Sequence, residues 1–436
     1  MKLAKALTQG SFLRHNVVFF FGSVVVGVVN YAYYPVLGRM MDPASFGEIQ
    51  VLVSFFLQFT IFLSVLGMIT VNITTNYVDT KKAHRIIFEL EKLAVYGALA
   101  MLAVTIFASE FLREQLRFDS GLPFIALALA LLVSIPQTFR SAFARGQKAF
   151  GVASISQLIG ASVKIIFSAG LVVLGLGVTG AIFGIVAAQL AAFFYAARWA
   201  ARLGFSRPSD THYGTLPDIR AVLPEIKYAG SVFVGLLSIT LLMSIDVIVV
   251  KYYFDAHTAG LYAGIATVAR TVFFLAAPIS QVLMPLVKID QPDQKNLLLL
   301  IKSIALTIFI CGPVVVVCAI FPELLTKLLM GSAYLEYSSL LPILALVVFI
   351  ISLVNLVFMY YLTLRQKTVT LIGIIGFVVS LSIMIMWHDT LQSVVYGLLF
   401  TSCFTLFVTG VYVLVNLKRG GRNAQQNDLN RHTDIQ

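Results

Sequence analysis

Long apolar stretches follow one another along the whole sequence, with short polar segments between them. A helix needs roughly 20 mostly apolar residues to cross the hydrocarbon core of a bilayer. A lipid-facing backbone must satisfy its own hydrogen bonds, and closed barrels would show short alternating segments instead. The pattern therefore predicts an all-α polytopic membrane protein with about 12 transmembrane helices. We expect these spans at residues 17–38, 46–74, 93–111, 123–143, 150–174, 178–197, 228–250, 258–287, 297–321, 339–363, 368–387 and 391–416.

Composition supports the same class of protein. The 436 residues are 59% hydrophobic and only 12% charged, with a mean hydropathy of +0.92. Soluble domains carry about 45–50% apolar and about 25% charged residues, so a water-soluble globule is excluded. Cys311, Cys318 and Cys403 lie in apolar runs without metal-ligand spacing. Nothing resembles a phosphate-binding loop, so we expect no cofactor, no metal and no ATP-driven step.

The net charge of +11 reflects the loops on one side of the predicted helices. Most of the 31 Lys and Arg residues fall in alternate loops, beginning with the N-terminal segment and ending with the C-terminal tail. Cytoplasmic loops of membrane proteins collect such cations. This distribution predicts that both termini are cytoplasmic, and it explains the basic charge without a nucleic-acid partner.

The longest inner loop, Arg198–Lys227, divides the predicted helices into six before and six after. An even number of spans per half gives both halves the same orientation, as in transporters built from parallel repeats. We expect an N-lobe at residues 1–227, with the central loop, and a C-lobe at residues 228–436, with the polar tail.

Two matching turns support a repeat. Asp42 lies five residues before Gly47, and Asp255 lies five residues before Gly260. Both pairs fall at the outer end of the first span of a predicted half. We therefore expect the two turns to be equivalent in the two lobes.

The segment from Leu37 to Gly47, LGRMMDPASFG, resembles a signature of the polysaccharide transporter, or oligosaccharide flippase, family. SIDVIVV at residues 244–250 and AGLY at residues 259–262 resemble a second stretch of that family. This family belongs to the multidrug/oligosaccharidyl-lipid/polysaccharide (MOP) exporter superfamily. The resemblance implies a flippase that moves lipid-linked oligosaccharide across the bacterial cytoplasmic (inner) membrane for O-antigen, capsule or exopolysaccharide assembly.

A flippase for a sugar pyrophosphate lipid needs cations for the head group, and charges inside a bilayer are functional candidates by default. Lys164 lies near the middle of its span, on a stripe of small and polar residues. It is interpreted as a phosphate contact, as a lysine that pairs with a neighbouring helix, or as one that extends to the membrane interface. Arg270 offers a planar fork for phosphate, with an ion pair to Asp246 as the alternative. Asp246 is in turn a candidate for ion coupling or the carboxylate of that pair.

Uncharged polar side chains follow the first two spans at helical spacing. Asn30 belongs to one such stripe, and Gln50, Ser54 and Gln58 form the other. Amides and hydroxyls suit sugar hydroxyls, which both donate and accept hydrogen bonds, although they also hold membrane helices together. We take Asn30 and Gln58, with the two cations, as candidate substrate-binding residues.

Three functions stay open at this point. The first is a non-enzymatic flippase that works by alternating access, with membrane lipids and polysaccharide-assembly proteins as further partners. The second is an ion-coupled multidrug exporter of the same superfamily, which would need acidic residues in its cavity. The third is a membrane polysaccharide polymerase, for which the short outer loops and the lone external histidines His257 and His388 offer no catalytic constellation.

Overall fold

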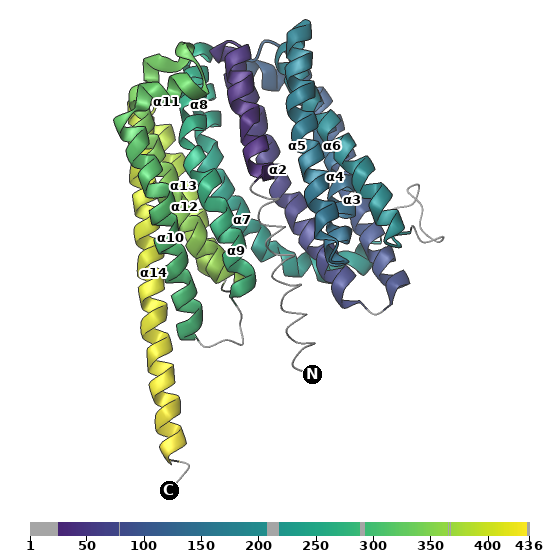
Figure 1. Ribbon diagram of the computed structural model, residues 1–436, viewed down its shortest axis with the longest axis vertical. Helices are drawn as coiled ribbons and strands as arrows, with labels where there is room; N and C mark the ends of the chain where they lie inside the picture. Colours follow the sequence, from purple (N-terminus) through teal and green to yellow (C-terminus); the bar gives the residue numbers. More distant parts are fainter. Residues whose placement is uncertain are drawn as a thin grey trace.

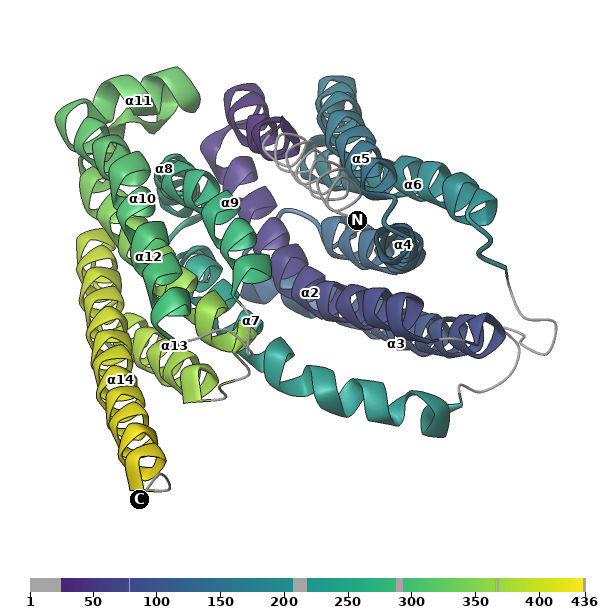
Figure 2. The same cartoon turned by 60° about the horizontal axis from the view of Figure 1, so that its bottom comes forward.

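The computed structural model describes residues 25–77, 79–206, 218–287, 293–364, 366 and 368–433, and every regular element in these ranges is a helix (Figures 1 and 2). The first described helix covers residues 25–40. It is followed by α2 (Pro43–Asn76), α3 (Thr80–Gln115), α4 (Leu122–Gly146), α5 (Phe150–Leu171), the π-helical turn η1 (Val172–Leu176), α6 (Gly177–Arg202), α7 (Ile219–Tyr253), α8 (Ala256–Ala269), α9 (Thr271–Leu286), α10 (Asp293–Ile320), α11 (Pro322–Leu329), the 3-10 helix η2 (Ser332–Leu340), α12 (Leu341–Thr363), α13 (Thr368–Met386) and α14 (Leu391–Thr433).

Within the described ranges, nine helical stretches are long and apolar enough to cross a membrane, or ten if α8 and α9 form one bent span. One of the nine, Phe150–Arg202, contains both α5 and α6. These two helices are joined at η1, where Gly175 and Gly177 have positive φ angles of 85° and 48° and allow the chain to turn. The described part of the chain is therefore all-helical, and the protein is a multi-span membrane protein. The number of 12 spans and the cytoplasmic position of the termini stay predictions.

Several helices extend beyond the apolar stretches that predict them. α3 begins at Thr80 rather than at residue 93, because the Asp79 carboxylate accepts hydrogen bonds of 3.0 and 3.2 Å from the backbone N–H groups of Lys81 and Lys82. A helix begins where its free N–H groups find a cap, and this point need not coincide with the edge of the hydrophobic stretch. α14 likewise continues to Thr433, and Figure 1 shows its last turns projecting from the bundle.

The helices form two groups that meet along α2. α4 packs against α3 and α6, and α6 packs against α5. In the other group, α12 packs against α9, α10 and α14, while α13 packs against α7 and α14. α2 contacts α4 in the first group and both α7 and α8 in the second. Figure 2 shows α2 between the two groups. Contacts between the groups therefore depend largely on the surface of α2.

The two Asp turns noted in the sequence lie side by side where α2 meets α8. The Asp42 carboxylate caps α2 and the Asp255 carboxylate caps α8, each through a 3.0 Å hydrogen bond from the backbone N–H three residues later. Hydrogen bonds from the Thr258 side chain and backbone also lower the pKa of the Asp255 carboxyl. Five residues after each cap, Gly47 and Gly260 bring the two backbones together. The two turns thus have the same local structure and pack directly against each other.

Replacement of Gly260 by Ala is expected to destabilise the protein by about 1–3 kcal/mol, in the range of overpacked cores. A Cβ atom at this position would lie 1.8 Å from the carbonyl oxygen of Pro43, so the two helices must separate. Gly312→Ala in α10 is the matched control, because a Cβ there meets no atom within 4 Å. Thermal unfolding in detergent measures the difference, and equal midpoints for the two variants would contradict a tight contact.

Candidate functional site

Arg270 lies at a break in the helix expected over residues 258–287. α8 ends at Ala269, α9 begins at Thr271, and the two axes are bent by about 40°. The Thr271 hydroxyl contacts the carbonyl oxygen of Val268 and the Tyr31 hydroxyl, both at 2.7 Å. A hydroxyl that bonds to a backbone carbonyl oxygen of the preceding turn promotes bending of a helix. Transporters commonly place binding sites at such discontinuous helices.

The side chain of Arg270 pairs with Asp246 of α7. Arg270 Nη2 lies 2.7 Å from Asp246 Oδ1, and the Tyr262 hydroxyl donates a 2.9 Å hydrogen bond to Asp246 Oδ2. The two charged side chains are 15% and 9% exposed. This is the ion pair that the sequence left as the alternative to phosphate binding and ion coupling. Both oxygens of the carboxylate are engaged, and Arg270 keeps further N–H groups.

Arg270 also lines a cavity of about 320 Å³ between the two groups of helices. We call it the polar cavity because ten of its lining residues are polar, although most of its exposed wall is hydrocarbon. The Gln50 side chain contributes an amide nitrogen that is buried and has no hydrogen-bond partner in the described residues. Most hydroxyls of the lining donate to carbonyl groups of their own helix. The polar lining residues are Tyr34, Gln50, Ser54, Thr60, Thr240, Ser244, Thr267, Arg270, Ser280 and Asn355.

Lys164 and Asn30 are in contact. Lys164 Nζ donates a 2.8 Å hydrogen bond to Asn30 Oδ1 and lies 4.5 Å from the centre of the Tyr33 ring. No carboxylate lies within 4 Å of this ammonium in the part of the chain that the structure describes. The contact with Asn30 agrees with an alternative that the sequence left open, a lysine that pairs with a neighbouring helix. Among the described residues, the charge is met by this amide oxygen and an aromatic face.

The two candidate cations lie on neighbouring faces of the helix at residues 25–40. Asn30 and Tyr33 of this helix contact Lys164 of α5. Tyr31 bonds to Thr271, next to Arg270, and Tyr34 lines the same cavity as Arg270. Figure 2 shows this helix between α5 and α9. The structure thus brings Asn30 to Lys164 and Asp246 to Arg270, with one helix between the two pairs.

Gln58 lies apart from both pairs. Its predicted stripe divides on α2, because Gln50 and Ser54 line the polar cavity while Gln58 lines a separate apolar groove. The Gln58 amide nitrogen is buried, with no hydrogen-bond partner among the described residues.

A buried charge cluster near the start of α2 and the end of α7 was not singled out from the sequence as a site. Lys251 Nζ lies 3.8 Å from Glu48 Oε1, and the two side chains are 1% and 5% exposed. The backbone N–H of Asp119 donates a 3.1 Å hydrogen bond to the same Glu48 oxygen. Arg117, with a positive φ of 52°, contacts the carbonyl oxygen of Phe254 at 3.4 Å. The cluster joins α2, the α3–α4 turn and α7.

A second buried cluster lies near the start of α3. Glu91 Oε2 is 2.6 Å from Arg140 Nη1 of α4. Glu89 pairs with Lys92 at 2.9 Å and accepts a 2.8 Å hydrogen bond from the Asp218 backbone N–H. These charges precede the predicted span and were therefore expected in a loop. The helical spacing of Ile86, Ile87, Leu90 and Leu93 around them is the signal that could have placed them on a packed helix.

The chain resembles a known protein family in sequence and several solved structures in fold. The sequence pattern of the family described as "Polysaccharide biosynthesis protein" matches residues 13–288. An inward-facing multidrug resistance MATE family transporter of the MOP superfamily has 13% identity and a TM-score of 0.71, covering 91% of this chain and 96% of its own. The lipid II flippase MurJ, in an inward closed conformation, has 14% identity and a TM-score of 0.71, covering 92% and 87%. The MATE transporter VcmN of Vibrio cholerae, in a bent form, has 11% identity and a TM-score of 0.64, covering 95% and 98%. No curated protein matches the chain by sequence.

The helical bundle, with a polar cavity between its two groups, therefore has the fold of MOP-superfamily membrane transporters. The chain belongs to the polysaccharide biosynthesis protein family, whose pattern matches more than half of its length. The sequence-based assignment to this family is confirmed. The three solved structures named above are those of two transporters and a flippase.

Removal of either partner of the Asp246–Arg270 pair is expected to be more damaging than removal of both. Removal of one partner leaves the other charge buried without an opposite charge, and this lowers the free energy of unfolding by about 3–5 kcal/mol. In a double-mutant cycle of Asp246→Ala and Arg270→Ala, we expect a coupling of about 2 kcal/mol in the free energy of unfolding. Unfolding in mixed detergent micelles measures it. Asp246→Ala combined with Lys302→Ala on α10 is the control that should be additive, and additivity of the first pair would contradict the ion pair.

Charge reversal at Glu48 is expected to cost about 3 kcal/mol or more, since it places a second cation beside buried Lys251. Glu110→Lys is the control, because it breaks a 2.6 Å ion pair with Arg113 in which Arg113 is 33% and Glu110 is 66% exposed. It is expected to lower the free energy of unfolding by less than about 1 kcal/mol. The exchange Glu48→Lys with Lys251→Glu should recover part of the loss. Unfolding in mixed detergent micelles measures these differences. A double variant as unstable as Glu48→Lys alone would argue against an ion pair between residues 48 and 251.

Proposed function

We propose that this protein translocates a lipid-linked oligosaccharide, carried on undecaprenyl pyrophosphate, across the bacterial cytoplasmic membrane. The two halves, residues 1–227 and 228–436, would expose the polar cavity to each side in turn. Family membership supports a role in polysaccharide biosynthesis. Similarity of fold to MurJ supports a lipid-linked substrate, since that protein is a lipid II flippase.

The observation that carries this proposal is the environment of Lys164. A cation inside a bilayer costs about 2.5–3.5 kcal/mol on insertion scales, so it is retained when something compensates it. Lys164 has only the Asn30 amide oxygen and the Tyr33 ring as described partners. A pyrophosphate supplies the anion that this position lacks. Asn30, whose side-chain oxygen accepts from Lys164, would bond a sugar or phosphate oxygen through its amide N–H groups.

Arg270 has a second part in the proposal. Its pairing with Asp246 leaves N–H groups free for an anionic ligand, because a guanidinium carries five donors. Arg270 lines the polar cavity beside the break between α8 and α9, which supports this part of the proposal. The Gln50 amide nitrogen in the same cavity still needs an acceptor. Sugar hydroxyls or phosphate oxygens meet that need.

Ion-coupled multidrug export is the second candidate, because MATE transporters share the fold. A cavity for cationic drugs needs a carboxylate that is free to bind them. Asp246 has both oxygens engaged by Arg270 and Tyr262. The polar cavity therefore fits an anionic head group better than a cationic drug.

The test is transport by purified protein in liposomes. The probe is undecaprenyl pyrophosphate that carries a fluorescent N-acetylglucosamine disaccharide, and a membrane-impermeant quencher reports its movement between leaflets. We expect flipping by the wild type, a loss of roughly tenfold or more for Lys164→Ala, and partial activity for Lys164→Arg. Lys302→Ala, an exposed cation on α10, is the control that should behave like the wild type. Wild-type liposomes no faster than empty ones would refute the proposed function.

A further inference from the structure

An apolar groove runs between α2 and α3. α3 packs much more closely against α4 than against α2, which leaves an open volume of about 880 Å³ between the two helices. α4 contributes Phe124, Leu127 and Leu131 to the lining, and the start of α7 contributes Gly230 and Phe233. Four helices therefore form one continuous groove.

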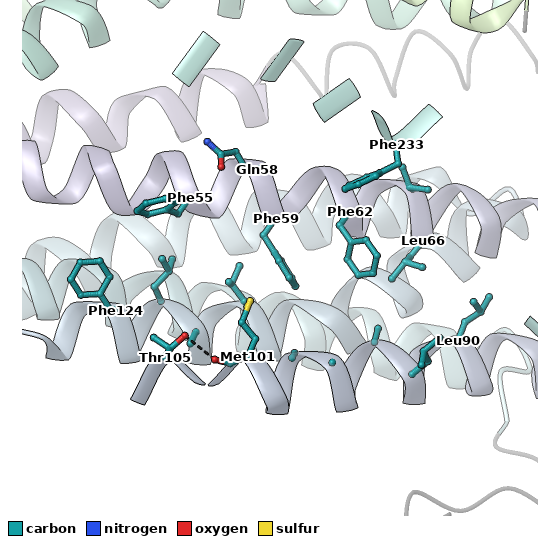
Figure 3. Close-up of a pocket in the computed structure, with 18 of the residues that line it drawn as sticks. Phe55, Gln58, Phe59, Phe62, Leu66, Leu90, Met101, Thr105, Phe124 and Phe233 are labelled. Atoms are coloured by element: carbon teal, nitrogen blue, oxygen red, sulfur yellow. Dashed lines mark hydrogen bonds between the residues drawn. The ribbon is translucent and has the colours of Figure 1, made fainter. Parts of the chain in front are cut away.

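The lining of this groove is almost entirely hydrocarbon. Phe59 and Phe62 of α2 and Met101 of α3 point into the space between the two helices (Figure 3). The polar side chains of the lining are Gln58 and Thr105, and the Thr105 hydroxyl already donates to the Met101 carbonyl oxygen at 2.8 Å. Such a surface favours an apolar ligand without head-group chemistry.

The length of the groove identifies the kind of ligand. On α3 the lining extends from Leu90 to Leu112, which at 1.5 Å per residue is about 33 Å. This matches the full hydrocarbon thickness of a bilayer, about 30 Å. An acyl chain of an ordinary phospholipid reaches only the midplane, about half that distance. A single chain that fills the groove must be much longer than a phospholipid tail.

The groove adjoins the polar cavity across α2. Gln50, Ser54 and Leu57 line the cavity, while Phe55 and Phe59 line the groove from the next face of the same helix. A molecule with a polar head and a long apolar tail fits this arrangement, with α2 as the shared wall. We propose that the groove holds the polyprenyl tail of the substrate during transport, an inference that rests on the proposed function.

Filling the groove tests this inference. Gly97 of α3 lines the groove, and a Cβ atom there meets no atom within 4 Å, so Gly97→Trp occupies the groove without a backbone clash. Gly312→Trp in α10 is the matched control, with the same freedom from contacts and no place in the groove. In the liposome assay we expect a loss of roughly tenfold or more for Gly97→Trp, because binding energy of the remote tail is lost, and near wild-type flipping for Gly312→Trp. Wild-type rates for Gly97→Trp would overturn the tail site and leave the flippase standing.

Photo-crosslinking tests the groove independently of flipping. Benzoylphenylalanine replaces Phe59 in the groove or Phe309 of α10, which is 77% exposed, as the control. The protein is reconstituted in phosphatidylethanolamine and phosphatidylglycerol vesicles with radiolabelled undecaprenyl phosphate, which has the tail but no sugar. We expect label at position 59, removed by excess unlabelled undecaprenyl phosphate, and little at position 309. Equal labelling of both positions, or phospholipid adducts alone at position 59, would overturn the inference, even if the flipping assay failed for the wild type.

Discussion

A charge in the hydrocarbon layer persists only where a neighbouring group compensates it, and this constraint decides much of how these helices meet. Asp246 and Arg270 join α7 to the break after α8, Glu91 and Arg140 join α3 to α4, and Glu48 and Lys251 join α2 to α7. Each of these pairs connects different elements, so the contact that compensates the charges also holds the helices together. Lys164 departs from this rule among the described residues, because its partners Asn30 and Tyr33 are neutral. That departure is the reason why the proposed function assigns an anionic ligand to Lys164.

The packing around α2 differs from one part of the helix to another. At its N-terminus, Gly47 meets Gly260 with no space for even a methyl group. Farther along the same helix, Phe59 and Phe62 face an open groove toward α3. A helix that is held tightly at one end and loosely along one side can fix the two halves of the molecule and still leave room for a lipid. The polar and apolar parts of a lipid-linked sugar would then meet different faces of one helix.

Much of this architecture follows from local chemistry that a sequence displays. Hydropathy reports the helices, and the recurrence of Asp and Gly at residues 42, 47, 255 and 260 reports two like turns, because capping and close approach each demand a particular residue. The Asp246–Arg270 pair was foreseen as an alternative, since both charges fall inside apolar stretches. The break at Arg270 was not, because neither Gly nor Pro marks it and the Thr271 contacts arise only from tertiary packing. The sequence also did not predict that Gln58 and Gln50 line different cavities. Residues four apart stay close to one face of a helix, and other helices decide where one cavity ends and the next begins.

The pairing of Asp246 with Arg270 also has an electrical meaning. Two opposite charges held 2.7 Å apart form a dipole without net charge, so displacement of the pair through a membrane potential performs almost no electrical work. An isolated ammonium such as that of Lys164 differs, since a full crossing of one elementary charge is worth about 2.3 kcal/mol per 100 mV. A pyrophosphate bound beside it would reverse the sign of the charge that moves. If the proposed function holds, the charge that crosses the membrane with the substrate would therefore depend on Lys164 of α5.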